Sequence, residues 1–198
     1  MKKLTIELIV QKCKTDNLQK IKKLDVWSSD LEEISIIKEL PALEICSLSL
    51  NKINQLKYFS NSQNLTELYL RKNQISDLFE IRCLQNCSKL TRLNLLSNKF
   101  HGNISSVSYM RDLTSLYLGD NNFAGDISSV ENLHQLTTLR LSGNKFSGLL
   151  DPLQNLTNLM DLELSSNFFE GNISSLGNLT NLRILKADDL FQRNHRQI

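Results

Sequence analysis

The sequence predicts an α/β solenoid, in which about eight short parallel strands form a curved concave sheet and a helix caps the N-terminal end. Three observations lead to this fold class. A pattern of the form L-x-x-L-x-L-x-x-N-x-φ, with an apolar residue at φ, recurs along the chain. Its copies start 22 to 25 residues apart, a period typical of proteins built from stacked repeats. The chain is 40% hydrophobic and 22% charged, which is the composition of a folded protein rather than a disordered one.

The first element is a capping helix predicted within residues 1–17. Apolar side chains recur there at the spacing i, i+3, i+4 and i+7, on Ile6, Ile9, Val10 and Cys13. This spacing places them on one face of an amphipathic helix. Glu7 interrupts the apolar run and no small-residue cleavage site follows, so the segment is not expected to be a secretory signal peptide.

Seven repeats are predicted over residues 18–181, followed by a degenerate terminal repeat and tail over residues 182–198. The copies of the pattern start at Ile21, Leu43, Leu65, Leu90, Leu113, Leu136, Leu159 and Leu182. In x-L-x-L-x the leucines alternate, so one face of each short strand is buried. A single repeat cannot bury its leucines alone, and neighbouring repeats complete the core. Because the strand pattern never breaks, we interpret residues 1–198 as a single domain.

Positions outside the strands also recur. The ninth position is Asn51, Asn73, Asn98, Asn121, Asn144 and Asn167. An amide there can satisfy backbone groups that the turn leaves unpaired, which predicts a stacked asparagine ladder. The later repeats add Phe100, Phe123, Phe146 and Phe169, each followed two residues on by Gly102, Gly125, Gly148 and Gly171. We expect a stacked aromatic spine and tight turns with positive φ at the glycines.

The repeat pattern resembles the leucine-rich repeat family over about residues 18–192. Residues 1–98 have a narrower resemblance, carried by Leu24 and Trp27, by "DLEEIS" with "PALE", and by "ELYLRKNQI". They are similar to the cilia- and flagella-associated protein 410 family of small ciliary leucine-rich-repeat proteins. Residues 99–192, with "FEGNISSLGNLTNL", resemble receptor-type leucine-rich repeats. The first resemblance implies a role in cilia, and the second implies recognition of a ligand.

The predicted binding surface is the strand face that the leucines leave open. The third, fifth and seventh positions of each repeat point to the concave side. The candidate partner-binding residues there are Trp27, Ile45, Glu67, Tyr69, Arg71, Arg92, Leu96, Tyr117 and Arg140. Trp, Tyr and Arg dominate interface energies because they bury a large area and keep a polar end. We therefore predict a protein partner on the concave face, although any one of these residues alone is equally consistent with a solvated sheet.

The sequence predicts no enzyme, no metal site and no cofactor. Its histidines are His101, His134 and His195. None of them has a recurrent nucleophile or carboxylate partner, and neither a phosphate-binding glycine loop nor an H-E-x-x-H pattern occurs. Cys83 and Cys87 form a C-x3-C pair without the further ligands that zinc needs. The net charge of +2 does not indicate nucleic acid, and no apolar stretch reaches the roughly 18–20 residues of a membrane span.

Three functions remain open at this point. The first is a cytoplasmic, non-enzymatic protein-binding scaffold in cilium or cytoskeleton organisation, with the cilium or basal body as its location within the cell. The second is an extracellular or receptor-type ligand-recognition module. It is suggested by the F-x-G repeats and by N-x-[ST] sequons at Asn64, Asn86, Asn103, Asn155, Asn172 and Asn178. The third is a regulatory subunit of a phosphatase-like enzyme, by analogy with other proteins of 22-residue repeats.

Overall fold

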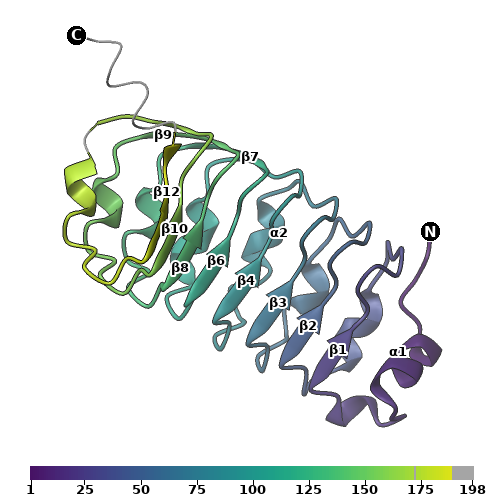
Figure 1. Ribbon diagram of the computed structural model, residues 1–198. Helices are drawn as coiled ribbons and strands as arrows, with labels where there is room; N and C mark the ends of the chain where they lie inside the picture. The colour runs from purple at the N-terminus through teal and green to yellow at the C-terminus, as the bar shows by residue number, and fades with distance from the viewer. Residues whose placement is uncertain (172, 189–198) are drawn as a thin grey trace.

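A parallel sheet of short strands runs the length of the computed structural model, which describes residues 1–171 and 173–188 (Figure 1). Its strands are β1 Lys23–Asp25, β2 Ile45–Ser47, β3 Glu67–Tyr69, β4 Arg92–Asn94, β6 Ser115–Tyr117, β8 Thr138–Arg140, β10 Asp161–Glu163 and β12 Ile184–Lys186. They pair in that order, so the predicted parallel sheet of eight strands is confirmed. Residue 172 and the predicted tail from 189 to 198, with His195, lie outside the described residues.

The predicted N-terminal helix is present as α1, Ile6–Cys13. The Thr5 side chain accepts a hydrogen bond from the Leu8 N–H at 3.3 Å, which caps the first turn. Lys14 ends the helix in the left-handed conformation, with φ of 54°. The helix packs against β1 and covers the first strand of the solenoid, as Figure 1 shows beside the N-terminus.

The buried face of α1 differs from the predicted one. Ile9 is completely buried, whereas Ile6 is 47% exposed. Leu4 takes the place expected for Ile6: it is 4% exposed, and its N–H donates to the Glu33 carbonyl at 2.8 Å. The backbone bridge between Lys3 and Glu33 fixes the chain just before the helix. With the chain held in this way, Leu4 before the helix and Ile9 within it both pack in the core.

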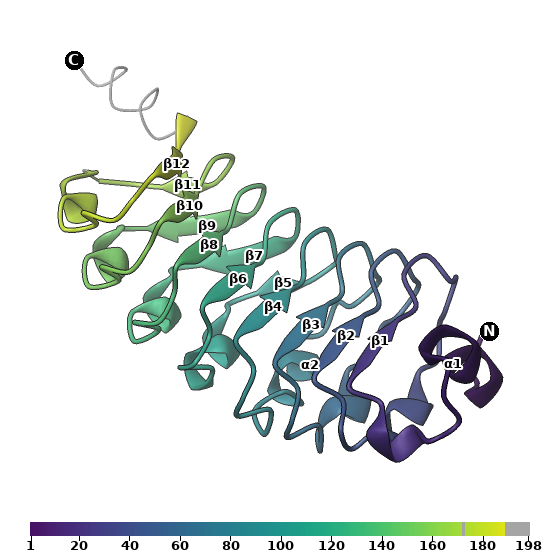
Figure 2. The same ribbon diagram turned by 60° about the horizontal axis from the view of Figure 1, so that its bottom comes forward.

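Short helices form the opposite, convex side of the solenoid (Figure 2). They are η1 Leu18–Lys20, η2 Ser35–Glu39, η3 Lys57–Phe59, α2 Phe79–Arg82, η4 Ser105–Tyr109, η5 Ser128–Val130, η6 Asp151–Leu153 and η7 Ile173–Leu176. The repeat with the 25-residue spacing is the one that carries the α-helical turn α2. Leucines of the sheet and apolar residues of these helices meet in one continuous core. In the part of the chain that the structure describes, no helix is long and apolar enough to cross a bilayer.

A second parallel sheet accompanies the F-x-G repeats, beside the main sheet in the later half of the chain (Figure 2). Its strands are β5 His101–Gly102, β7 Asn122–Gly125, β9 Lys145–Gly148 and β11 Phe168–Phe169. The sequence pattern did not predict these strands. The predicted aromatic spine is confirmed, because the four phenylalanine rings stack with centroids 5.4, 5.9 and 6.2 Å apart. The glycines that follow them have φ between 85° and 88°, as expected.

The asparagine ladder closes the turns after the strands. Asn144 is representative: its Nδ2 donates to the carbonyls of Leu118 at 3.0 Å and Leu141 at 2.9 Å. Its Oδ1 accepts from the Phe123 N–H at 3.0 Å. Equivalent bonds link Asn51, Asn73, Asn98, Asn121 and Asn167 to their own repeat and to the preceding one. Each asparagine therefore joins two neighbouring repeats, which fixes the spacing of the strands.

Candidate protein-binding surface

Most strands of the main sheet present the candidate residues because their two outer residues are open to solvent around a buried centre. The exceptions are β6, where Ser115 is buried too, and β12, which is exposed throughout. On β3, Leu68 is completely buried while Glu67 and Tyr69 are partly open to solvent. The same alternation holds on β4, where Arg92 and Asn94 flank the buried Leu93. Successive strands are in register, so these open residues form rows across the sheet.

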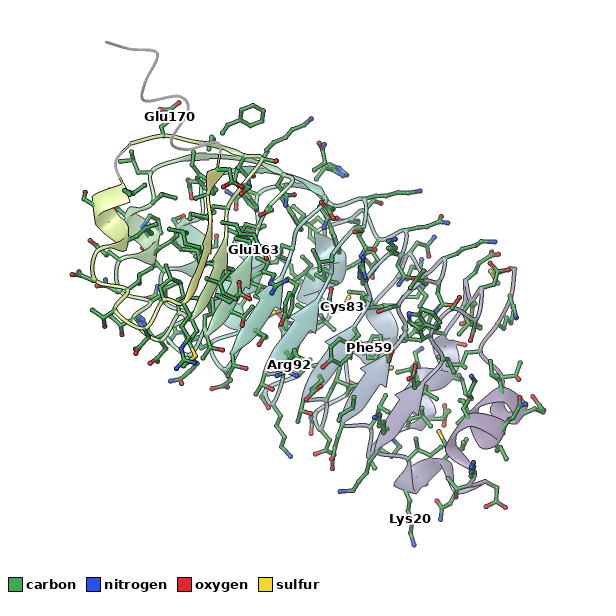
Figure 3. The ribbon with its side chains drawn as sticks, viewed as in Figure 1. Lys20, Phe59, Cys83, Arg92, Glu163 and Glu170 are labelled. Atoms are coloured by element: carbon green, nitrogen blue, oxygen red, sulfur yellow. The ribbon has the colours of Figure 1, made fainter. Side chains whose placement is uncertain are left out.

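The rows enclose a shallow hollow of about 450 Å³ over β3, β4, β6 and β8, here called the concave hollow. It is lined by Tyr69, Arg71, Arg92, Asn94, Leu96, Tyr117 and Arg140. Six of these seven residues are among the nine predicted from the sequence. Asn94 was not predicted, although its fifth position in the repeat is an outward one. Figure 3 shows Arg92 on the open face of the sheet.

At the N-terminal side of the hollow, one arginine is joined to a tyrosine and a glutamate. The Arg92 Nη1 donates to the Tyr69 Oη at 3.3 Å and lies 3.8 Å from the Glu67 Oε2. The Tyr69 hydroxyl in turn donates to the Glu67 carboxylate. Burial, followed by this bond to Glu67, raises the pKa of Tyr69. The hydrogen bond with Tyr69 also raises the pKa of Arg92, so the arginine stays charged and the tyrosine stays neutral.

At the C-terminal side, Arg140 is held by carboxylates. Its Nη2 lies 2.6 Å from the Asp161 Oδ2, and its Nη1 lies 3.4 Å from the Glu163 Oε1. The hydrogen bond with Asp161 raises the pKa of Arg140. The guanidinium carbon also lies 5.6 Å from the centre of the Tyr117 ring, within the range of a cation–π contact. This side chain therefore forms a fixed wall of the hollow.

Arg71 is different from the other two arginines. It is exposed at the seventh position of its repeat, and its guanidinium makes no ion pair or hydrogen bond with any residue that the structure describes. The Nε atoms of Arg92 and Arg140 are buried and also lack a partner among the described residues. Among the described residues, Arg71 thus has no partner for its guanidinium, and Arg92 and Arg140 each have one unpaired Nε–H.

The other three predicted residues lie around or beyond the hollow. Glu67 borders it through the contact with Tyr69, and Ile45 lies opposite Glu67 in the neighbouring strand β2. Trp27 follows β1 at the N-terminal end and is 55% exposed. With β2 between them, β1 and β3 are about 10 Å apart. The structure therefore brings Glu67 to the hollow and leaves Trp27 and Ile45 outside it.

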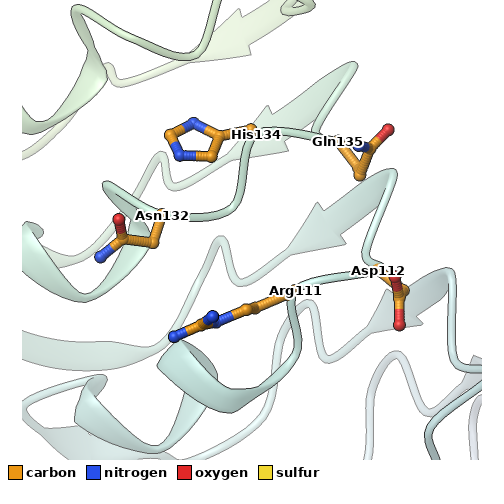
Figure 4. A pocket seen from close by; sticks show the side chains of 5 residues that line it. All are labelled: Arg111, Asp112, Asn132, His134 and Gln135. Atoms are coloured by element: carbon orange, nitrogen blue, oxygen red, sulfur yellow. The ribbon is translucent and has the colours of Figure 1, made fainter.

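The chemistry elsewhere in the described part of the chain is limited. Residues 1–171 and 173–188 contain no group of three or more His, Cys, Asp and Glu side chains placed to hold a metal ion. Burial raises the pKa of the Cys46 thiol and raises that of Cys87 to about 11, which makes both thiols weak nucleophiles at neutral pH. A second hollow of about 320 Å³ is bordered by Arg111, Asp112, Asn132, His134 and Gln135 (Figure 4). Its lining side chains include no thiol or hydroxyl nucleophile.

Comparison with known proteins agrees with the repeat fold. The family model described as Leucine Rich Repeat matches residues 135–156, which cover one repeat around β8. The fold of the chain is that of a leucine-rich-repeat solenoid. Human cilia- and flagella-associated protein 410 is 41% identical over 96 residues, a match that covers 48% of this chain and 38% of the human protein. The chain therefore corresponds to well under half of the length of that relative.

Solved structures share most of the solenoid. Internalin C2 of Listeria monocytogenes superposes with a TM-score of 0.72 at 28% identity, covering 92% of this chain and 91% of the internalin. A TDR receptor superposes with a TM-score of 0.77 at 29% identity, covering 91% of this chain and 32% of the receptor. The two resemblances expected from the sequence, to a ciliary leucine-rich-repeat protein and to receptor-type repeats, are thus both found.

Proposed function

We propose that this leucine-rich-repeat chain is a non-enzymatic scaffold that binds a protein partner on the concave face, at the concave hollow. The observation that carries the proposal is the gathering of Tyr69, Tyr117 and three arginines over four neighbouring strands. Tyrosine and arginine contribute most to interface energies because they combine a large contact area with polar ends. The hollow crosses about 14 Å of sheet at the usual strand spacing, which suits an extended segment or a protruding loop.

The support beneath the hollow favours binding. Its four strands each pair with a neighbour on both sides, and the asparagine ladder ties the turns that follow them. A surface that is already ordered loses little conformational entropy on binding, so more of the contact energy becomes affinity.

Trp27 extends the proposed surface toward the N-terminal end. At this end of the sheet a tryptophan can either cover the first strand or anchor a ligand. Helix α1 packs on β1, and the Trp27 side chain is 55% exposed. Its indole N–H has no acceptor among the described residues. These features support the anchor role, since an exposed tryptophan with a free donor is well suited to an interface.

The proposed cellular role is in cilium or cytoskeleton organisation, with the protein in the cytoplasm, including the cilium or basal body. Its support is the likeness to human and mouse cilia- and flagella-associated protein 410, at 41% and 38% identity. Localisation of a tagged chain in ciliated cells tests this role. Enrichment at the basal body or axoneme is expected, and a secreted or surface-bound protein would contradict it.

The binding proposal is tested by removing the apolar floor of the hollow. The variant replaces Tyr69, Leu96 and Tyr117 by alanine, and the matched control replaces Phe79 and Tyr109, which are 67% and 62% exposed on the convex side. Proteins retained by each tagged chain are compared by quantitative mass spectrometry, and the affinity of a recovered partner is measured by calorimetry. We expect the hollow variant to lose at least about tenfold in affinity and the control to keep it. Unchanged affinity in a folded hollow variant would refute the proposal.

A second candidate function is recognition of an extracellular ligand. The observation that favours it is the second sheet with its F-x-G turns, together with the superposition on a TDR receptor at a TM-score of 0.77. Of the sequon residues, Asn86, Asn103, Asn155 and Asn178 are exposed. A decrease in mass of the native protein after glycosidase treatment would support this function over the ciliary one.

A further inference from the structure

The charges of the concave hollow are arranged unequally. Three arginines line it, and none of its lining residues is acidic. The carboxylates that belong to this surface stand on its flanks, Glu67 on β3 and Asp161 with Glu163 on β10. The hollow therefore carries positive charge between two negative borders.

The three arginines do not use their charge equally. Arg140 is already paired with two carboxylates. Arg92 lies 3.8 Å from a single carboxylate, and its one hydrogen bond among the described residues uses Nη1. Its Nε N–H is buried without a partner, which is unfavourable because the buried donor has lost its hydrogen bonds to water. Arg71 has no anionic partner in the described part of the chain.

We propose that Arg71 and Arg92 bind a carboxylate from an acidic side chain of the protein partner. This inference rests on the proposed function, because it assigns the chemistry of the same surface. A carboxylate can accept two parallel hydrogen bonds from the Nε and Nη2 edge of a guanidinium. A rotation of the Arg92 side chain toward the ligand gives its Nε an acceptor, and Arg71 supplies a second, uncompensated charge.

The negative borders select for this kind of ligand. A continuous polyanion such as nucleic acid would bring further phosphates against Glu67 and Asp161, where like charges repel. A single acidic residue in an otherwise neutral segment avoids both borders. Leu96 and Tyr117 line the same hollow, so the residue next to the acid in the partner is expected to be apolar.

The test uses a small probe and arginine-selective NMR of the whole chain. The probe is N-acetyl-glutamyl-leucine amide at millimolar concentrations, and its neutral counterpart is N-acetyl-glutaminyl-leucine amide. We expect saturable shifts of the Nε–H signals of Arg71 and Arg92 with the glutamyl probe, and none with the glutaminyl probe. Arg111, an exposed arginine outside the hollow, is the internal control.

Matched variants test the assignment of the two ligands. Replacing Arg71 or Arg92 by Gln should weaken binding of the glutamyl probe about tenfold each, whereas R111Q should leave it unchanged. R92K keeps the charge but loses the planar fork, so it should bind the probe less tightly than the wild-type chain. Equal shifts with both probes, no saturable shift at Arg71 and Arg92, or equal loss in R111Q would overturn the proposal.

The outcome is distinguishable from failure of the proposed function. If the partner is lost when Tyr69, Leu96 and Tyr117 are replaced, but Arg71 and Arg92 do not bind the glutamyl probe, the scaffold function stands. The proposed carboxylate site is then wrong. If the chain binds the probe at Arg71 and Arg92 but retains its partner after the same replacement, the carboxylate site stands. The proposal that the hollow binds the protein partner is then wrong.

Discussion

Replacement of Asn144 by alanine is expected to destabilise the solenoid by about 2–4 kcal/mol. The magnitude follows from what each bonded group loses. The Phe123 N–H donates to the Asn144 Oδ1 at 3.0 Å and is left without that acceptor, and a stranded buried donor is unfavourable by about 1–3 kcal/mol. The carbonyls of Leu118 and Leu141 lose less, because they still accept from Asn121 and Asn167 at 2.9 and 3.0 Å.

Urea unfolding followed by circular dichroism measures this effect. The matched control is N132A, because Asn132 is exposed and its side chain donates, among the described residues, only to the neighbouring Glu131 carboxylate, at 3.3 Å. The control should change the free energy of unfolding by no more than about 0.5 kcal/mol. If the two variants unfold at the same urea concentration with the same slope, the ladder does not stabilise the fold and the reasoning is wrong.

Three further outcomes follow from the described residues. F123A removes a completely buried ring and should lower the free energy of unfolding by about 3–5 kcal/mol, whereas F79A, at a 67% exposed position, should stay within about 0.5 kcal/mol. In G148A the new Cβ would lie 3.6 Å from the nearest atom, so it meets no clash. The free energy of unfolding should still fall by about 1–3 kcal/mol, because φ of 85° disfavours any side chain. An unchanged melting temperature would contradict this expectation. The pKa of Cys87 is raised from 9.0 to about 11 in the folded chain, so the unfolded chain binds fewer protons between these values and stability should fall as pH rises through them. C87A should flatten that part of the pH–stability curve, and an unchanged slope would count against the burial of the thiol.

The repeated features of the fold could be predicted because repetition strengthens weak signals. One asparagine or one phenylalanine carries little information, but six asparagines and four phenylalanines at constant spacing require one structural explanation. The same holds for the outward strand positions, which placed Tyr69, Arg92 and Tyr117 on a common face. Their meeting in one hollow follows from the in-register pairing of β3, β4 and β6.

Other features could not be predicted because their signals are local or absent. The strands of the second sheet carry no alternating leucines, and they coincide with the F-x-G motif, from which we expected only turns. The residue before each ladder asparagine has positive φ, yet only Gly143 is a glycine there, while Leu50 and Lys72 adopt φ of 55°. The neighbouring asparagine bonds stabilise a conformation that these side chains disfavour. The ion pair of Arg140 with Glu163 could have been predicted from the sequence, because the two residues occupy the same position in adjacent repeats.

The central claim, that a protein partner occupies the concave hollow, is tested most directly by hydroxyl-radical footprinting of the chain with and without its partner. The account predicts that Tyr69, Leu96 and Tyr117 become protected from oxidation in the complex. Tyr109 and Phe79, exposed on the convex side, should be oxidised equally in both samples. Protection of these two convex residues, with unchanged oxidation of the hollow, would contradict the account.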